Sequence, residues 1–207
     1  MISLFIDTSS VDVSIAILRD SSVLASVTKS IPNQHSVYTV SFIDDVLKKA
    51  NLGTRDVQKI MVVVGPGSFT GLRIGVTIAK VYGYLENIDV IPVSSLRMRS
   101  LSCSHDYCLS IIDAHHDHFY MGLYDKDNSS VIEEKYASLD EVRKIISEYN
   151  PSIVSDMDGK IDDIDYFKQE LDFSKIYSFY KDVSGGNVHF LKPNYLKLPQ
   201  VLEERHD

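Results

Sequence analysis

The sequence predicts an α/β fold of two related lobes. Three strand-like segments open the chain at hairpin spacing, helix-like and strand-like segments then alternate, and a second strand pair joined by a short turn starts near residue 109. With 207 residues, 44% of them hydrophobic and 24% charged, the chain is long and apolar enough for two cores. We place the first lobe at 1–100 and the second lobe with a C-terminal tail at 101–207.

The first lobe is predicted from short apolar runs and from a helical spacing of apolar residues. The expected elements are strands at 2–7, 13–18 and 23–28, a helix at 38–50, a strand at 60–64, a helix at 71–85 and a strand at 89–93. Gly53 stands where the C-terminal cap of the first helix is expected. The order is therefore β-β-β-α-β-α-β.

The second lobe begins as a hairpin and then loses its clear pattern. The expected elements are strands at 109–113, 118–124 and 131–136, a helix at 141–149, a strand at 152–156 and a helix at 163–171. Asp140 is the expected N-cap of the helix at 141–149. Residues 172–207 are expected to be irregular.

Composition excludes several classes of protein. The net charge is −8 and no run of Lys or Arg is present, so we expect weak affinity for nucleic acid by the chain alone. No apolar run is long enough to cross a membrane, and Asp7 interrupts the N-terminal apolar stretch, which argues against a signal peptide. With two cysteines, Cys103 and Cys108, we expect a reduced, cytoplasmic protein.

A glycine-rich segment, GPGSFTGLRIG at 65–75, follows the apolar run 60–64. A strand, a glycine turn and a helix hold phosphate in many proteins. Here Leu72 follows Gly71 where a P-loop needs lysine, and the three glycines give G-x-G-x-x-x-G instead of the dinucleotide G-x-G-x-x-G. A direct phosphate loop is therefore the less favoured interpretation.

The small residues continue into the helix at intervals of four, as Gly71, Gly75, Ala79 and Gly83. They form one stripe. Each glycine inside a helix costs about 1 kcal/mol relative to alanine, so the stripe indicates close approach of another backbone. Two partners remain open: this chain's own sheet or first helix, and a helix of another protein.

The segment GPGSFTGLRIGVTIAK at 65–80 strongly resembles the signature of the TsaB family, also called YeaZ, which acts in threonylcarbamoyladenosine synthesis in tRNA. Further segments resemble the family's motifs: IDTS at 6–9, QHS at 34–36, VSSL at 93–96, IDAHHDHFYMGLY at 112–124 and PNYLK at 193–197. Where the family commonly has an Ala-rich helix before the last motif, this chain has only residues 182–187. The second lobe is therefore expected to be reduced.

The resemblance implies an actin-like, Hsp70-like ATPase (ribonuclease H-like) fold. It implies a non-catalytic subunit that acts as scaffold and activator of a TsaD-like catalytic subunit, which transfers threonylcarbamoyl to adenosine next to the tRNA anticodon. A TsaE-like ATPase is a further implied partner. The chain alone is expected to form a homodimer, and it is expected to contact tRNA only as part of the complex. No partner in a membrane is implied.

The resemblance also implies that the helices of the first lobe carry the dimer surface and receive TsaD. The candidate interface residues are Val40, Ile43, Leu47, Gly71, Arg73, Gly75, Ala79 and Gly83.

Actin-like ATPases bind the phosphates of the nucleotide between two small hairpin turns. In the first turn Asp7, Thr8 and Ser9 are candidate nucleotide-binding residues. In the second turn His115 and His116 replace the expected glycines, which blocks close backbone approach. We therefore expect no catalytic residue, no efficient ATP hydrolysis by the chain alone and no cofactor of its own, with ATP and Mg²⁺ expected instead at the complex with TsaD.

Two alternative functions and one alternative site are less favoured by the sequence. A stand-alone actin-like ATPase or kinase would bind nucleotide between Asp7 and the turn at 113–117. A glycoprotease is disfavoured because none of the seven histidines has another four residues on, the spacing of the metal pair in the family's catalytic partner. His115, His116 and His118 could bind a metal ion. Their spacing instead favours a solvated turn with partly packed histidine rings, so no metal site is predicted.

Overall fold

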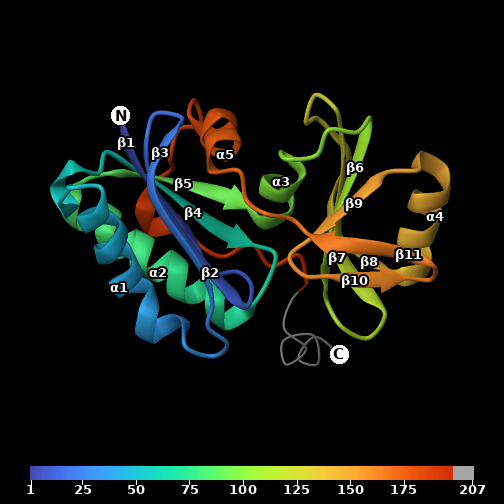
Figure 1. The fold of residues 1–207 in the computed structure, drawn as a ribbon. Coiled ribbons are helices and arrows are strands. Elements are labelled where there is room, and N and C mark those ends of the chain that lie inside the picture. Colours follow the sequence, from blue (N-terminus) through green and yellow to red (C-terminus); the bar gives the residue numbers. More distant parts are fainter. Residues whose placement is uncertain (198–207) are drawn as a thin grey trace.

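In a computed structural model, which describes residues 1–197, the chain folds into two lobes, each built on one mixed sheet (Figure 1). The strand orders are β3-β2-β1-β4-β5 and β10-β11-β9-β6-β7-β8. In the first sheet β1 pairs antiparallel with β2 and parallel with β4, and in the second β6 pairs in the same two ways with β7 and β9. The predicted pair of related lobes is confirmed.

The elements of the first lobe follow the predicted order. They are β1 (Ile2–Asp7), β2 (Asp12–Arg19), β3 (Ser22–Ser30), α1 (His35–Lys49), a 3₁₀ turn (Thr54–Asp56), β4 (Lys59–Gly65), α2 (Phe69–Glu86), β5 (Asp89–Ser94) and α3 (Ser95–Ser100). The short helix α3 was not predicted.

The second lobe and the returning C-terminal segment contain the remaining elements. They are β6 (Tyr107–Asp113), β7 (His118–Asp125), β8 (Ser130–Ser138), α4 (Leu139–Tyr149), β9 (Ser152–Ser155), β10 (Gly159–Ile161), β11 (Ile164–Lys168), α5 (Phe173–Tyr180) and a 3₁₀ turn (Val188–Phe190).

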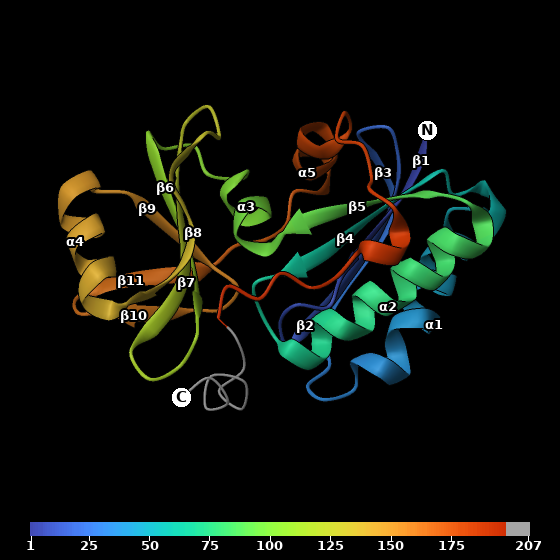
Figure 2. The same cartoon turned by 180° about the vertical axis from the view of Figure 1, so that it is seen from behind.

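Helices cover both faces of the first sheet (Figure 2). On one face α1 and α2 pack over apolar side chains such as Leu4, Ile15 and Val62. On the other face α3 and α5 pack over Phe5, Met61 and neighbouring side chains. Because both faces are covered, β1 and β4 are buried along almost their whole length, as expected for parallel strands at the centre of an α/β sheet.

The glycine stripe of α2 packs against this chain's own first turn. A β-carbon at Gly71 would lie 2.0 Å from the Thr8 carbonyl oxygen, and one at Gly75 would lie 2.4 Å from the Thr8 hydroxyl oxygen. At Gly83 a β-carbon would lie 2.4 Å from the Val90 side chain on β5. Of the two alternatives left by the sequence, the chain's own sheet is therefore the neighbour that requires small residues.

Several predicted boundaries and caps are wrong for local reasons. α1 begins at His35 rather than 38, and the His35 ring makes a 2.8 Å hydrogen bond with the Ser10 carbonyl oxygen. Asn51, not Gly53, adopts the left-handed conformation after α1. Ser138, not Asp140, caps α4, since its hydroxyl accepts a 3.3 Å hydrogen bond from the Glu141 amide.

The predicted helix at 163–171 is wrong: most of this segment is the strand β11, which forms a hairpin with β10. Asp162 occupies the left-handed region (φ 53°) at its turn, and Tyr166 is buried while its neighbour Phe167 is exposed. That alternation is the period of a strand, and a five-residue strand is too short to display it clearly in the sequence.

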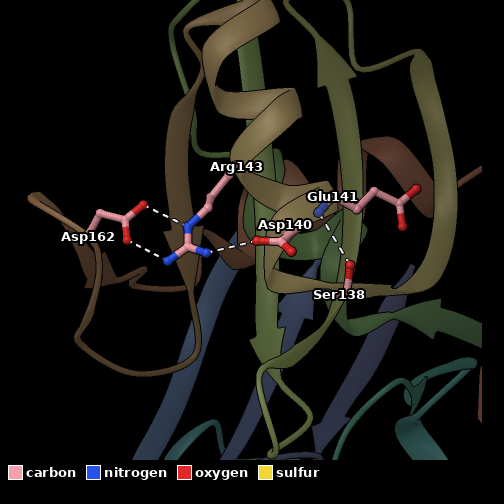
Figure 3. A network of polar contacts seen from close by, with 5 residues as sticks. All are labelled: Ser138, Asp140, Glu141, Arg143 and Asp162. Carbon is pink, nitrogen blue, oxygen red and sulfur yellow. Dashed lines mark hydrogen bonds and ion pairs between the residues drawn. The ribbon is translucent and has the colours of Figure 1, made fainter.

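Figure 3 shows how this hairpin is fastened to α4. The Arg143 guanidinium donates two hydrogen bonds to the Asp162 carboxylate, at 2.8 and 2.6 Å, and a third to Asp140 at 2.9 Å. The paired hydrogen bonds fix the orientation of the guanidinium and hold the turn of the hairpin against the first turn of the helix.

Part of the segment 101–207, which the sequence analysis assigned to the second lobe with a C-terminal tail, packs on the first lobe. After residue 172 the chain returns to the first lobe, where Ile176, Tyr177 and Tyr180 of α5 join the core beside Phe5. The segment 172–207 was expected to be irregular because its elements are short. Residues 198–207 lie outside the described residues.

The contact of Thr8 with α2 predicts two separable stability losses. We expect Gly71→Ala to destabilise the fold by about 3 kcal/mol, because its β-carbon meets backbone that cannot move, and Gly75→Ala by about 2 kcal/mol. Adding Thr8→Ala should relieve Gly75→Ala by about 1 kcal/mol but not Gly71→Ala, since only the former meets the side chain. Urea unfolding of the single and double variants measures both effects.

Gly186→Ala is the control for these variants. A β-carbon at Gly186 would meet nothing within 4 Å, so the free energy of unfolding should change by less than about 0.5 kcal/mol. Equal losses from Gly71→Ala and Gly186→Ala would contradict the packing described here.

Candidate functional site

A cleft of about 850 Å³ separates the two hairpin turns that the sequence singled out. The first turn contributes Ser9 and Ser10, and the second contributes Ala114 and His115. The N-termini of α1 and α2 line the same cleft, which brings the start of each helix to the junction of the lobes. This size is within the range of small-molecule sites.

The candidate nucleotide-binding residues are buried and largely committed to the fold. The Thr8 hydroxyl donates a 2.7 Å hydrogen bond to the Gly71 carbonyl oxygen, and the Ser9 carbonyl oxygen accepts one from the Ser68 amide at 2.7 Å. The Asp7 carboxylate accepts a 2.8 Å hydrogen bond from the Ser9 amide. The three residues form a rigid turn, and their role in binding nucleotide stays a prediction.

Arg99 is a buried charged residue at the candidate site that the sequence analysis did not single out. It is 3% exposed, donates a 2.6 Å hydrogen bond to the Ser95 carbonyl oxygen, and lines a second cavity of about 560 Å³ together with Asp7 and Asp156. Burial raises the pKa of Asp7, and the positive charge of Arg99 opposes that rise. The sequence shows only two arginines close together, Arg97 and Arg99. Their positions become informative once both are placed on the helix α3.

The donor set around Asp7 does not suit Mg²⁺. A divalent cation at this carboxylate would have to enter beside the buried guanidinium of Arg99, and the two positive charges would repel each other at low dielectric. In the described part of the chain, no group of three or more His, Cys, Asp or Glu side chains has a geometry that could hold a metal ion.

The second turn has a glycine-like backbone without glycine. His115, His116 and Asp117 all lie in the left-handed region, with φ of 63°, 55° and 58°. The His118 ring stacks on Tyr136 with 4.8 Å between ring centres and hydrogen-bonds the His116 carbonyl oxygen at 2.7 Å. His115 and His116 are exposed, so the prediction of a solvated turn with partly packed histidines is confirmed.

The structure corrects the choice of interface residues. Six of the candidates are buried inside the first lobe and present no surface to another protein: Ile43, Leu47, Gly71, Gly75, Ala79 and Gly83. Val40 is 59% exposed, and Arg73 is exposed with its guanidinium 3.8 Å from the centre of the Phe69 ring. The three glycines are covered by this chain's own residues Thr8 and Val90, so they are not available to a partner.

Beside the glycines, α2 presents a different apolar stripe. Ile74, Ile78, Val81 and Leu85 follow one another at three- and four-residue spacing; the first two are half-buried, and the last two are 54% and 72% exposed. On the neighbouring helix α1, Val37 is 66% exposed and Val40 59%. We call these six residues the outer helical stripe.

Known proteins resemble this chain over nearly its whole length. A family model described as TsaD, tRNA N6-adenosine threonylcarbamoyltransferase, matches residues 22–190. The tRNA threonylcarbamoyladenosine biosynthesis protein TsaB of Bacillus subtilis is 30% identical over 220 residues, which span 97% of this chain and 96% of that protein.

The chain belongs to the TsaB family. A second TsaB, from Escherichia coli, is 28% identical over 132 residues, or 62% of this chain and 57% of that protein. The solved structure of YeaZ from Pseudomonas aeruginosa has a TM-score of 0.78 at 20% identity and covers 94% of this chain and 99% of that one. The TsaB fold is thus the fold of this chain, and the family resemblance drawn from residues 65–80 is confirmed.

Among residues 1–197, no helix combines the length and apolarity that crossing a bilayer requires.

The buried pair of Asp7 and Arg99 predicts how stability depends on pH. The pKa of Asp7 in the folded state is raised above its ordinary value of 3.8, so its contribution to stability is complete below that pH and is lost as pH rises through the folded-state pKa. Replacing Arg99 by Met removes the positive charge that favours the ionised carboxylate, so the pKa of Asp7 rises further. We expect the free energy of unfolding to fall by about 3 kcal/mol near neutral pH as a result.

Urea unfolding across a pH series measures this effect in Arg99→Met, Asp7→Asn and the double variant. The double variant should recover more than half of the loss at neutral pH and show a flatter pH profile, because no buried carboxylate remains to ionise. A pH profile of Arg99→Met that parallels that of the unmodified protein would contradict the pairing.

Proposed function

We propose that this chain is a non-catalytic subunit of tRNA threonylcarbamoyladenosine synthesis, which holds and activates a TsaD-type threonylcarbamoyltransferase. The proposal rests on membership of the TsaB family, whose B. subtilis relative is named for that pathway, and on the match to the TsaD family model. A TsaE-type ATPase and tRNA are then met within the assembly, and the free chain pairs with itself.

The observation that carries the proposal is the outer helical stripe. Exposure of the valine and leucine side chains on two adjacent helices to water is unfavourable. Burying such a surface against a partner is a usual basis of a stable protein interface. A partner helix of the related TsaD fold that is laid along α2 would bury Val81 and Leu85. We therefore assign pairing to this stripe instead of to the glycines beneath it.

The turn chemistry supports a subunit that does not itself catalyse. Thr8 is hydrogen-bonded to α2, Asp7 lies beside a buried guanidinium, and histidines occupy the second turn. ATP and Mg²⁺, if the pathway needs them at this subunit, would therefore be held at the boundary with the partner rather than between the two turns.

A charge placed in the stripe should prevent pairing without unfolding the chain. We expect Val81→Asp to weaken binding to the TsaD of the same organism at least tenfold, because an aspartate would be desolvated in the interface, while the free energy of unfolding changes by less than about 0.5 kcal/mol. Size-exclusion chromatography with light scattering and calorimetric titration measure the pairing.

Val131→Asp is the matched control, since Val131 is 38% exposed on β8, away from both helices. It should leave pairing and tRNA modification unchanged. Unaltered binding by Val81→Asp would refute the assignment of the stripe, whereas full tRNA modification by the partner in the absence of this chain would refute the activator role.

The size of the cleft favours a second candidate, a stand-alone actin-like ATPase or kinase. Titration of ATP with Mg²⁺ into the isolated chain separates the two functions. We expect no binding tighter than about millimolar and no turnover above background, because the side chains of His115 and His116 occupy the second turn where a phosphate would have to approach. Turnover at the rate of ordinary ATPases, about 1 per second or more, would favour the enzyme.

A further inference from the structure

A cavity of about 560 Å³ lies beside the cleft, and charged side chains of both signs line it. We call it the charged cavity. Asp7, Asp12 and Arg99 line it from the first lobe, and Asp156, which directly follows β9, lines it from the second. Ser10 and Asp156 also line the cleft, so the two spaces adjoin at the junction of the lobes. The proposed role as a subunit makes no use of these charges.

Two buried charges on the wall have no ion-pair contact within the part of the chain that the structure describes. Arg99 is 3% exposed and Asp7 is 2% exposed. No carboxylate oxygen of the described residues lies within 4 Å of an Arg99 nitrogen, and no cationic nitrogen lies within 4 Å of an Asp7 oxygen. The guanidinium donates a 2.6 Å hydrogen bond to the Ser95 carbonyl oxygen, which leaves further N–H groups available. Because a buried charge is costly unless it is paired, a ligand that supplies the opposite charge gains affinity here.

The other charges of the charged cavity show which ligand fits. Asp12 is already paired, because its carboxylate accepts a hydrogen bond from the Lys168 ammonium group. Besides Arg99, the charged groups that remain on the described wall are carboxylates: Asp7, Asp156, Asp158 and Glu170. A ligand with only negative charge would be repelled by these carboxylates, and a ligand with only positive charge would be repelled by Arg99. A small molecule that carries both charges avoids both repulsions.

We propose that the charged cavity binds a free α-amino acid. The ligand's carboxylate accepts hydrogen bonds from Arg99, and its ammonium group donates to Asp156 and Asp7. A planar guanidinium can donate two parallel hydrogen bonds to one carboxylate, which fixes the orientation of the ligand. Leu171 and Phe173 also line the cavity and supply an apolar wall for an aliphatic side chain. The site is independent of the proposed pairing with a transferase.

An amino acid held in this way joins the two lobes. Arg99 lies on α3, whose side chains pack on the first sheet, whereas Asp156 follows β9 of the second sheet. The ion pair of Asp12 with Lys168 already crosses the same junction. Because one end of the ligand is fixed on each lobe, we expect slower amide exchange in residues 7–12 and 155–158 when the site is filled.

Calorimetric titration of the full-length chain with L-leucine near neutral pH tests the proposal. We expect saturable binding of one molecule per chain. Two analogues that each lack one charge are the comparison: 3-methylbutylamine has no carboxylate, and 4-methylpentanoate has no ammonium group. Each should bind at least about tenfold more weakly than leucine, because it leaves either Arg99 or the carboxylates without a partner.

Asp156→Asn and Arg99→Lys are the test variants. Asp156 is half-buried, so Asp156→Asn should fold, bind leucine at least about tenfold more weakly and lose the preference for leucine over 4-methylpentanoate. Arg99→Lys keeps the charge but cannot donate two parallel hydrogen bonds, so it should reduce the preference for leucine over 3-methylbutylamine. Asp163→Asn changes an exposed carboxylate outside the cavity and is the matched control, which should bind leucine like the unmodified chain.

Any of three results would overturn the proposal. The first is the absence of saturable leucine binding at concentrations up to about 10 mM. The second is equal binding of leucine and of one single-charge analogue, which would indicate a simple anion or cation site. The third is an equal loss of leucine binding in Asp163→Asn and Asp156→Asn, which would indicate a changed fold instead of a lost contact.

Discussion

The contact between the β1–β2 turn and helix α2 is the constraint on which the rest of this structure depends. The Thr8 carbonyl and hydroxyl oxygens occupy the space that side chains at Gly71 and Gly75 would take, and the hydroxyl donates to the Gly71 carbonyl oxygen at 2.7 Å. The glycines weaken α2 as a helix, and the close contact compensates for that loss. The contact also places the N-terminus of α2 at the cleft and leaves the side of the helix that carries Ile74 to Leu85 facing solvent.

The same contact explains why a ligand-like motif serves the fold. A strand, a glycine turn and a helix N-terminus occur here with the geometry of a phosphate site, but the chain's own first turn fills the space beside the glycines. Arg99 lies beside Asp7 in the neighbouring cavity, and two histidines and Asp117 occupy three consecutive left-handed positions in the second turn, so charged or bulky side chains lie at both turns.

The lobes are joined by specific contacts rather than by a single linker. Arg97 of α3 donates a 2.6 Å hydrogen bond to Ser130 of the second lobe, and its guanidinium lies 3.9 Å from the centre of the Tyr124 ring. The chain then returns through α5 to the core of the first lobe.

The sequence by itself determined the local elements and the family. Apolar runs and the signature at 65–80 predicted the three opening strands, α1, β4 and α2, because their periodicity is strong and depends on neighbours in the chain. It also established that Gly71 and Gly75 need a close neighbour, from the cost of glycine in a helix.

Only the tertiary structure decided which neighbour that is, since Thr8 is 63 residues from Gly71 along the chain. The hairpin of β10 and β11, the return of α5, and the burial of Arg99 beside Asp7 were hidden for the same reason. Short segments and buried charges gain their stability from partners distant in sequence, and no local pattern encodes such partners.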